Sequence, residues 1–125
     1  MTIVRKVPLG CYLTSSEIAR LRAYAEGFEL SAPSLCRLIV QRELEARELG
    51  GLKLHYLKKV GKEDGDRFTA RFANRRVKDR FLAHARQCGL GSDDAVGILF
   101  RAEPIEQRLR HALGFGIAVE SDRAL

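Results

Sequence analysis

The chain has 125 residues and a mass of 14.0 kDa, which suits one ordinary domain and excludes a cofactor-binding domain joined to a substrate domain. Its 22 Lys and Arg outnumber 16 Asp and Glu, so the net charge is +6 and anionic partners are expected. An apolar fraction of 46% excludes a disordered chain. We therefore expect one compact domain over residues 1–125.

Three cysteines, an odd number at wide spacing, argue against a disulfide framework and favour a reducing compartment. Cys11, Cys36 and Cys88 are each expected to be small buried apolar residues. No run approaches the roughly 18 apolar residues of a membrane span, and the N-terminus lacks the apolar run of a signal peptide. These features predict a soluble cytoplasmic protein with no membrane partner.

The histidines lie in separate segments, at His55, His84 and His111, without a carboxylate or thiol at the spacing of metal ligands. No glycine-rich phosphate loop is present either. The sequence therefore predicts no catalytic residue, no metal and no cofactor.

One order of elements occurs twice: a short extended run, a helix, a corner that contains glycine, and a longer helix. Copy one spans residues 5–50, with a strand at 7–13 and Ser15 or Ser16 as the expected N-cap of its first helix. Ser31 or Ser34 is expected to cap the second helix. The apolar positions of the two helices are Ile18, Leu21, Ala25 and Phe28, then Leu35, Leu38, Ile39 and Leu44.

Copy two spans residues 67–113, with a strand at 67–72 and a helix start at Ala73–Asn74. Its apolar positions are Val77, Phe81, Leu82, Ala85 and Cys88, then Val96, Ile98, Leu99 and Ala102. Pro104 either kinks the second helix or begins a separate one that runs to Leu113, and residues 114–125 are expected to form a tail. The two copies align with an offset of 59 at Leu13 and Phe72 but 60 at Leu30 and Leu90, which indicates one inserted residue in the first helix or its corner.

The segment between the copies, residues 51–66, alternates only in part between apolar and polar residues. It is either a hairpin that leads into the second strand or an ordered linker, and the pattern leaves both alternatives open. The charged residues that precede it are expected to form an exposed helix face: Arg42, Glu43, Glu45, Arg47 and Glu48.

The strand of copy two carries the chemistry, because successive side chains of a strand point to opposite faces. Phe68, Ala70 and Phe72 share one face, and Arg67, Thr69 and Arg71 share the other. Antiparallel pairing with residues 7–13 would form a two-stranded ribbon that packs on four helices. Its outer face would then offer guanidinium and hydroxyl groups that fit base edges in the DNA major groove. A solvated strand face without a function is the alternative.

Basic residues are concentrated just beyond this face. Residues 67–80 hold six Lys and Arg but a single acid, Asp79. Arg75, Arg76 and Lys78, in the first turns of the next helix, are expected to neutralise DNA phosphates beside the groove.

The pattern of copy two, Arg67–Phe72 followed by the corner Gly89–Ser92, resembles the ribbon-helix-helix family of bacterial DNA-binding proteins. Copy one matches that family at Leu9–Leu13 and Leu30–Ser34. Two copies in one chain are similar to the tandem forms among plasmid-transfer accessory proteins, which bind near a transfer origin and bend DNA. The resemblance implies a mainly helical fold in which one intrachain ribbon makes the chain a pseudo-dimer.

The resemblance assigns base reading to Arg67, Thr69 and Arg71. The matching positions in copy one are Pro8, Gly10 and Tyr12, of which only Tyr12 has a polar side-chain group. Copy one is therefore expected either to read bases weakly, through Tyr12 with the flanking Arg5 and Lys6 on DNA phosphates, or to support copy two without reading.

The resemblance also places DNA phosphates on the N-terminus of each second helix, where free N–H groups favour anions. Ser31, Ala32 and Ser34 suit this role in copy one. In copy two, Asp93 and Asp94 are expected to cap the helix and to repel a phosphate.

These observations predict a non-catalytic, sequence-dependent binder of double-stranded DNA, acting as a plasmid-transfer accessory factor or a transcriptional repressor. Its further partners would be a relaxase or another plasmid-processing protein, and additional copies of itself on DNA. The alternative is a protein–protein adaptor, antitoxin-like or relaxase-docking, whose ribbon has lost DNA reading.

Overall fold

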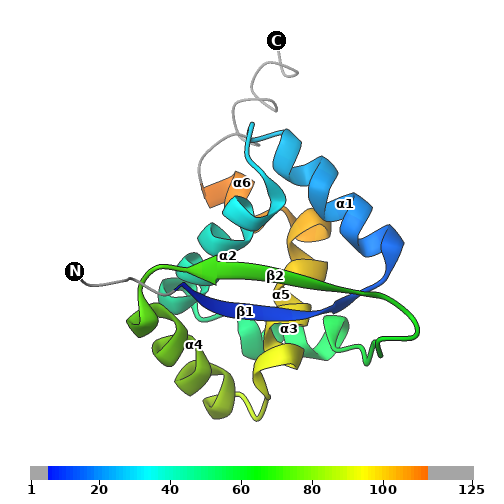
Figure 1. The fold of residues 1–125 in the computed structure, drawn as a ribbon. Helices are drawn as coiled ribbons and strands as arrows, with labels where there is room; N and C mark the ends of the chain where they lie inside the picture. The colour runs from blue at the N-terminus through cyan, green and yellow to red at the C-terminus, as the bar shows by residue number, and fades with distance from the viewer. Residues whose placement is uncertain (1–5, 113–125) are drawn as a thin grey trace, which may run out of the picture.

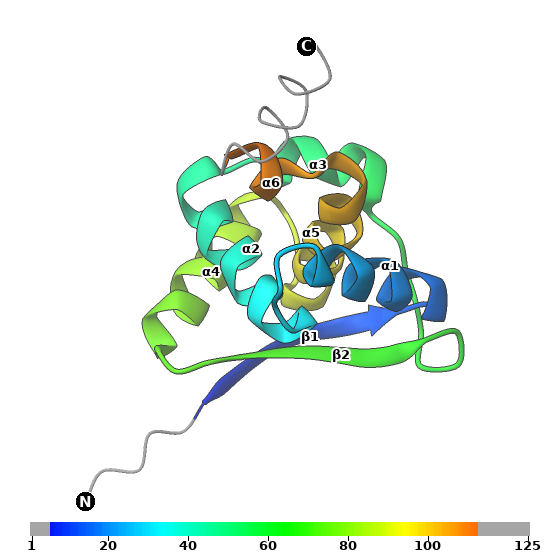
Figure 2. The same cartoon turned by 90° about the horizontal axis from the view of Figure 1, so that it is seen from above.

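The computed structural model describes residues 6–112, and 64% of these are helical. The elements in chain order are β1 (Val7–Leu13), α1 (Ser15–Glu26), α2 (Ala32–Ala46), α3 (Leu49–Tyr56), β2 (Asp66–Phe72), α4 (Arg75–Gln87), α5 (Ser92–Glu106) and α6 (Arg108–Ala112). The strands form a two-stranded antiparallel sheet, and the helices of the described range lie on one side of it (Figures 1 and 2). The prediction of a mainly helical fold with one short antiparallel ribbon is confirmed.

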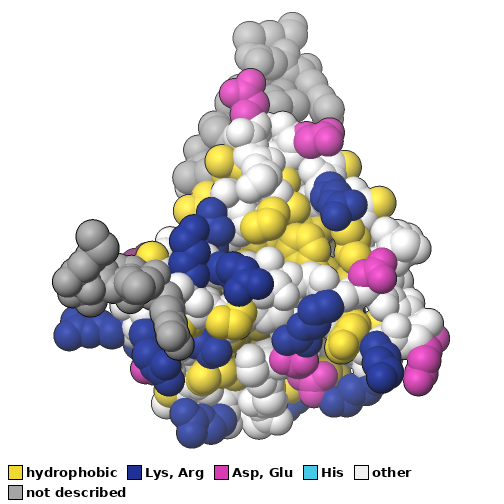
Figure 3. Space-filling view, viewed as in Figure 1, with side chains coloured by type: hydrophobic (Ala, Val, Ile, Leu, Met, Phe, Trp, Pro, Cys, Tyr) yellow, Lys and Arg dark blue, Asp and Glu magenta, His cyan; other side chains and the backbone are white. Residues whose placement is uncertain are grey.

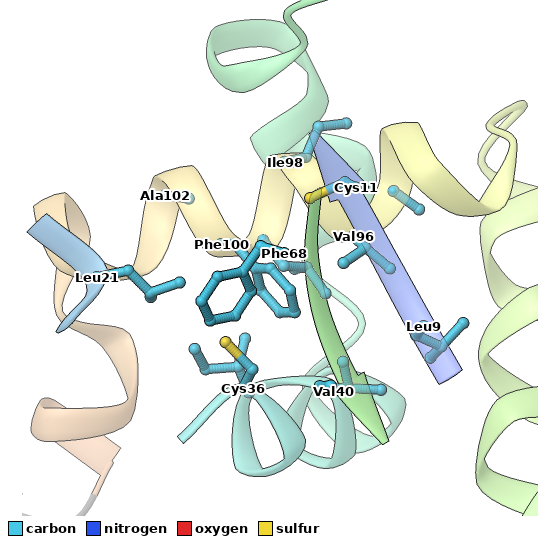
Figure 4. Packing of buried hydrophobic residues seen from close by; sticks show 14 of the residues in the cluster. Leu9, Cys11, Leu21, Cys36, Val40, Phe68, Val96, Ile98, Phe100 and Ala102 are labelled. Atoms are coloured by element: carbon cyan, nitrogen blue, oxygen red, sulfur yellow. The ribbon is translucent and has the colours of Figure 1, made fainter. Parts of the chain in front are cut away.

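The ribbon separates a buried face from an exposed one. Leu9, Cys11 and Leu13 of β1 are buried, and so are Phe68, Ala70 and Phe72 of β2. The phenyl rings of Phe68 and Phe100 meet edge to face with their centroids 5.9 Å apart, which joins the ribbon to α5 (Figure 4). Each buried strand residue stabilises the fold by roughly 1.5–3 kcal/mol when large and apolar, so the side-chain alternation holds the register.

Helix α5 is the centre of the molecule and lies behind the ribbon in Figure 1. Its residues from 95 to 103 are buried without interruption, as expected of a helix enclosed by other elements rather than lying on the surface. Cys11 and Cys36 are buried as predicted, whereas Cys88, also predicted to be buried, is half-buried because it lies at the C-terminal end of α4. Burial raises the pKa of the Cys11 thiol to about 12, so it behaves as a small apolar residue.

Several local features of the two halves of the chain recur at a nearly constant spacing. The N-caps Thr14 and Asn74 are 60 residues apart, as are the left-handed residues Arg47 (φ 52°) and Gln107 (φ 53°). In the strands the spacing is 59, and the antiparallel register pairs Gly10 with Thr69, so the ribbon itself has a local twofold axis between these two residues. The extra residue of copy two is Ala73, because Leu13 is followed at once by its cap whereas Phe72 is not. The expectation that the insertion lies in the first helix or its corner was therefore wrong.

Two equivalent buried carboxylates hold the halves together. Glu103 of α5 accepts hydrogen bonds from the Tyr24 hydroxyl of α1 at 2.5 Å and from the Leu109 amide at 2.9 Å. Its equivalent in α2, Glu43, accepts from the Leu49 amide at 2.9 Å and lies 2.6 Å from His84 Nε2 of α4. Each glutamate thus accepts a hydrogen bond from the first turn of the short helix that follows it, and each contacts the first helix of the other half.

The predicted exposed face was wrong at Glu43, which is 3% exposed. Its carboxylate is buried because it satisfies the unpaired amide groups of Glu48 and Leu49 at the start of α3. Leu38, predicted to be buried, is 40% exposed, and Val40 lies inside instead. The helix therefore turns a slightly different face to the core than its leucine pattern indicated.

Three boundaries also differ from those predicted. Thr14 caps α1 in place of Ser15 or Ser16, because Thr14 and Glu17 form a reciprocal capping box. Residues 51–66 do not form a hairpin: their first part belongs to helix α3, residues 57–65 are loop, and Asp66 begins β2. Pro104 does not begin a separate helix, because it lies inside α5, which continues to Glu106, and α6 starts at Arg108; of the two predicted alternatives, the kink is left.

Replacing Tyr24 with Phe should test the pairing of the halves. The change removes the hydroxyl that Glu103 accepts from, so the free energy of unfolding should fall by about 1–3 kcal/mol, measured by urea denaturation. Tyr12→Phe is the matched control, because this tyrosine lies on the outer face of the ribbon and should change stability by less than about 0.5 kcal/mol. Equal effects of the two changes would contradict a structural role for the Tyr24 pair.

Candidate nucleic-acid interface

The outer face of the ribbon carries the side chains predicted to read bases. The register places Arg71 opposite Pro8, Thr69 opposite Gly10 and Arg67 opposite Tyr12. Arg67 and Arg71 are exposed and Thr69 is half-buried. Because α1 through α6 pack on the opposite side, this face is open to a partner along its length (Figure 2).

Strand β2 supplies most of the polar groups of this face. A Cβ atom added at Gly10 would lie 2.7 Å from the Phe68 carbonyl oxygen and 2.9 Å from Thr69 Oγ1. Gly10 therefore allows the close approach of the two strands at the local axis, and a larger side chain there would displace Thr69. Pro8 adds no donor, so the β1 half of the face offers only Tyr12.

Arg67 is restrained from two sides. Its Nη1 donates to Asp93 Oδ2 at 2.7 Å, and its guanidinium lies 5.4 Å from the centroid of the Tyr12 ring. The hydrogen bond that Arg67 donates to Asp93 raises the pKa of the guanidinium above its ordinary value, so the group stays charged while its charge is partly compensated. The Tyr12 end of the face is thus held in a fixed arrangement.

At the Arg71 end lies a depression of about 300 Å³, which we call the Arg37 pocket. Its lining residues are Lys6, Arg37, Gln41, Arg71, Phe72, Ala73, Asn74 and Val77, with no carboxylate among the described residues. Arg37 Nη2 donates to Ser34 Oγ at 2.8 Å and Nη1 to the Arg71 carbonyl oxygen at 3.4 Å. These contacts hold a cation beside the end of the ribbon.

Arg37 and Gln41 were not among the site residues predicted from the sequence. A signal was present, because Arg37 follows the predicted cap residue Ser34 by three positions and helical side chains lean toward the N-terminus. Arg37 therefore covers the first turn of α2. Only the pairing of β1 with β2, however, brings that turn next to Arg71.

The N-terminus of α2 is built as predicted in part. Ser31 is the N-cap: its hydroxyl oxygen accepts from the Ser34 amide at 3.3 Å, and the hydroxyl donates to Ser34 Oγ at 2.9 Å. Ala32 is buried, so its side chain is unavailable to a ligand. Ser31 is exposed at this helix end.

The first turns of α4 carry the other predicted phosphate contacts. Asn74 caps the helix by accepting from the Arg76 amide at 2.8 Å. Arg75 lies 3.8 Å from Asp79 in an exposed ion pair, Arg76 is exposed, and Lys78 is half-buried. In Figure 3, Lys and Arg predominate over α4 and the adjoining end of the ribbon, whereas basic and acidic side chains mix at the opposite end.

At that opposite end the acids are engaged by bases. The N-cap of α5 is Gly91, and no side chain forms a capping hydrogen bond there. The prediction that Asp93 and Asp94 cap this helix was therefore wrong. Asp93 pairs with Arg67, and Asp94 pairs with Lys59 of the loop before β2. Both carboxylates still lie in the first turn of α5, where the helix dipole favours negative charge.

Arg5 and residues 114–125, for which we predicted a phosphate contact and a tail, lie outside the described residues. Within residues 6–112, no three His, Cys, Asp or Glu side chains are grouped to hold a metal ion. In the same range, every helix is too short or too polar to cross a membrane.

Comparison with known proteins found no matching protein-family model, no matching curated protein and no matching solved structure.

Glu17, which pairs with Arg101, makes the stability of the protein depend on pH. Burial raises the pKa of this carboxyl. The hydrogen bond from the Thr14 amide and the Arg101 guanidinium, 3.1 Å away, together lower it by more, so the pKa lies below its ordinary 4.5. A carboxyl whose pKa is lower in the folded than in the unfolded state stabilises the fold at pH values above its unfolded-state pKa. This contribution is lost as the pH falls through its folded-state pKa.

Glu17→Gln should therefore lower the free energy of unfolding at pH 7 by about 2 kcal/mol, because Arg101 loses its charged partner. The difference should shrink toward zero as the pH drops below 4.5. Urea midpoints at several pH values measure it, and Glu26→Gln on the exposed side of α1 is the control. A difference that does not decrease at all as the pH is lowered would rule out the charge as its cause.

Proposed function

We propose that this protein is a non-catalytic, sequence-dependent binder of double-stranded DNA that inserts its ribbon into the major groove. The observation that carries the proposal is the placement of Arg67, Thr69 and Arg71 on the solvent face of a ribbon whose other face is packed on helices. A two-stranded ribbon has the width that the major groove accepts. The net charge of +6 acts in the same direction.

Each side chain has a role in this proposal. Arg71 can donate two hydrogen bonds to guanine O6 and N7, and Thr69 can contact a base edge or a thymine methyl group. Arg67 reaches bases only within the limits that Asp93 and Tyr12 set. Arg75, Arg76 and Lys78, with the Ser31 end of α2, contact the backbone and position the ribbon.

The particular role rests on the resemblance of the sequence to tandem ribbon-helix-helix proteins. The repeated order strand, helix, helix and the local twofold axis through the ribbon support that arrangement. By analogy the protein acts as a plasmid-transfer accessory factor, with a relaxase as a protein partner, or as a transcriptional repressor. Since one ribbon covers few base pairs, adjacent copies would bind side by side on DNA.

One observation favours a protein–protein adaptor as the second candidate. Pro8 and Gly10 leave half of the face without donors, and Asp93 already holds Arg67. A surface of this kind suits a protein partner if the ribbon has lost its ability to read DNA.

A salt titration separates the two candidates. Binding to a random duplex should be measurable by fluorescence anisotropy at low salt and should weaken steeply as salt rises. Each neutralised phosphate contributes about 0.9 to the slope of log K against log salt concentration. Absence of binding at about 20 mM salt would leave the adaptor as the better proposal.

Arg71→Ala tests base reading. On a selected target site it should reduce discrimination against altered sites by about 1–3 kcal/mol, measured as the ratio of affinities for the two duplexes. Arg86→Ala, an exposed arginine in the last turn of α4, is the control and should leave the ratio unchanged. If Arg71→Ala weakens all duplexes equally, Arg71 contacts the backbone instead.

A further inference from the structure

The two ends of the ribbon occupy equivalent places in the fold but differ in chemistry. Under the local axis the Arg37 pocket corresponds to a region beside Leu13 and Tyr12. There the residues at the corresponding positions are Gly97 for Arg37, Arg101 for Gln41, Glu17 for Val77 and Tyr12 for Arg71. The charges and sizes of these four side chains decide which end can accept an anion.

The Tyr12 end is neutralised and covered. Arg101 is 8% exposed and lies 3.1 Å from Glu17, while Asp93 and Asp94 line the remaining hollow of about 40 Å³. Lys58 and Val60, from the loop that joins the halves, also line this hollow. Lys58 adds a second contact with Glu17 at 3.5 Å. This end therefore has neither the space nor the unbalanced positive charge that a phosphate requires.

The Arg71 end has both. Lys6, Arg37 and Arg71 line the open pocket, and none of them forms an ion pair with an acid in the described part of the chain. Three like charges around one hollow repel each other, and an anion between them removes that repulsion. Gln41 and Asn74 add neutral polar side chains to the pocket wall.

Arg37 is already oriented for such a ligand. Two of its N–H groups are directed to Ser34 Oγ and to the Arg71 carbonyl oxygen, and a guanidinium has five donors in all. The remaining donors are free to form a charge-assisted bond with a phosphate oxygen. Because the side chain is held before binding, little rotamer entropy is lost when the anion arrives.

We propose that the Arg37 pocket binds one DNA backbone phosphate beyond the Arg71 end of the ribbon, and that the Tyr12 end has no corresponding contact. The protein then holds DNA asymmetrically, with a defined polarity on the duplex, despite its local twofold axis. This inference rests on the proposed DNA binding and adds a site that the sequence analysis did not predict. The phosphate is that of a duplex backbone because the pocket adjoins the face that would enter the groove.

Two substitutions test the pocket from different directions. Arg37→Gln removes the central cation, and Val77→Glu introduces the acid that neutralises the equivalent region at the other end. Each should weaken binding to a random duplex about five- to tenfold at 0.1 M salt, and should reduce the salt slope by about 0.9. Arg86→Gln, which removes one exposed positive charge outside the pocket, is the control and should change the slope by much less.

Circular dichroism and thermal unfolding must first show that each variant is folded, and Arg37→Gln retains the test if Val77→Glu is not. Strong binding by the unmodified protein with unchanged binding by both variants would overturn the pocket while leaving DNA binding intact. Equal losses in Arg37→Gln and Arg86→Gln would also overturn it, since the effect would be one of net charge. Failure of the unmodified protein to bind would reject the proposed function and this inference together.

Discussion

The structure depends on the antiparallel pairing of two strands that are about 60 residues apart in the chain. Neither strand with its own pair of helices has enough neighbours to bury its apolar face, so each half completes the core of the other. Alternation then leaves the other face of both strands in solvent. The same pairing thus produces the core and the surface that we propose for DNA.

Buried carboxylates reinforce this pairing on the side away from the ribbon. Glu43 and Glu103 each accept from the backbone of the helix that follows, and each contacts a side chain of the opposite half, His84 and Tyr24. Burial raises the pKa of the Glu103 carboxyl, which reflects the cost of keeping a charge inside. These bonds offset that cost and join the two halves on the side away from the ribbon.

The two ends of the ribbon differ in their charges. The loop between the halves can cover only one end of the ribbon, since a single connection joins them. Lys58 and Lys59 of that loop pair with Glu17 and Asp94 at the Tyr12 end. The Arg71 end remains open and basic. The two ends of this ribbon therefore offer different surfaces to a partner.

Local features of the sequence were sufficient to predict the strands, their exposed residues Arg67, Thr69 and Arg71, and the start of α4 at Asn74. Alternation and capping act over a few residues, so they can be read directly from the order of side chains. The burial of Glu43, the restraint of Arg67 by Asp93 and the pocket around Arg37 were decided only by the tertiary structure. Each of them depends on contacts between segments that are distant in the chain, and no periodicity within one segment records which distant group it will meet.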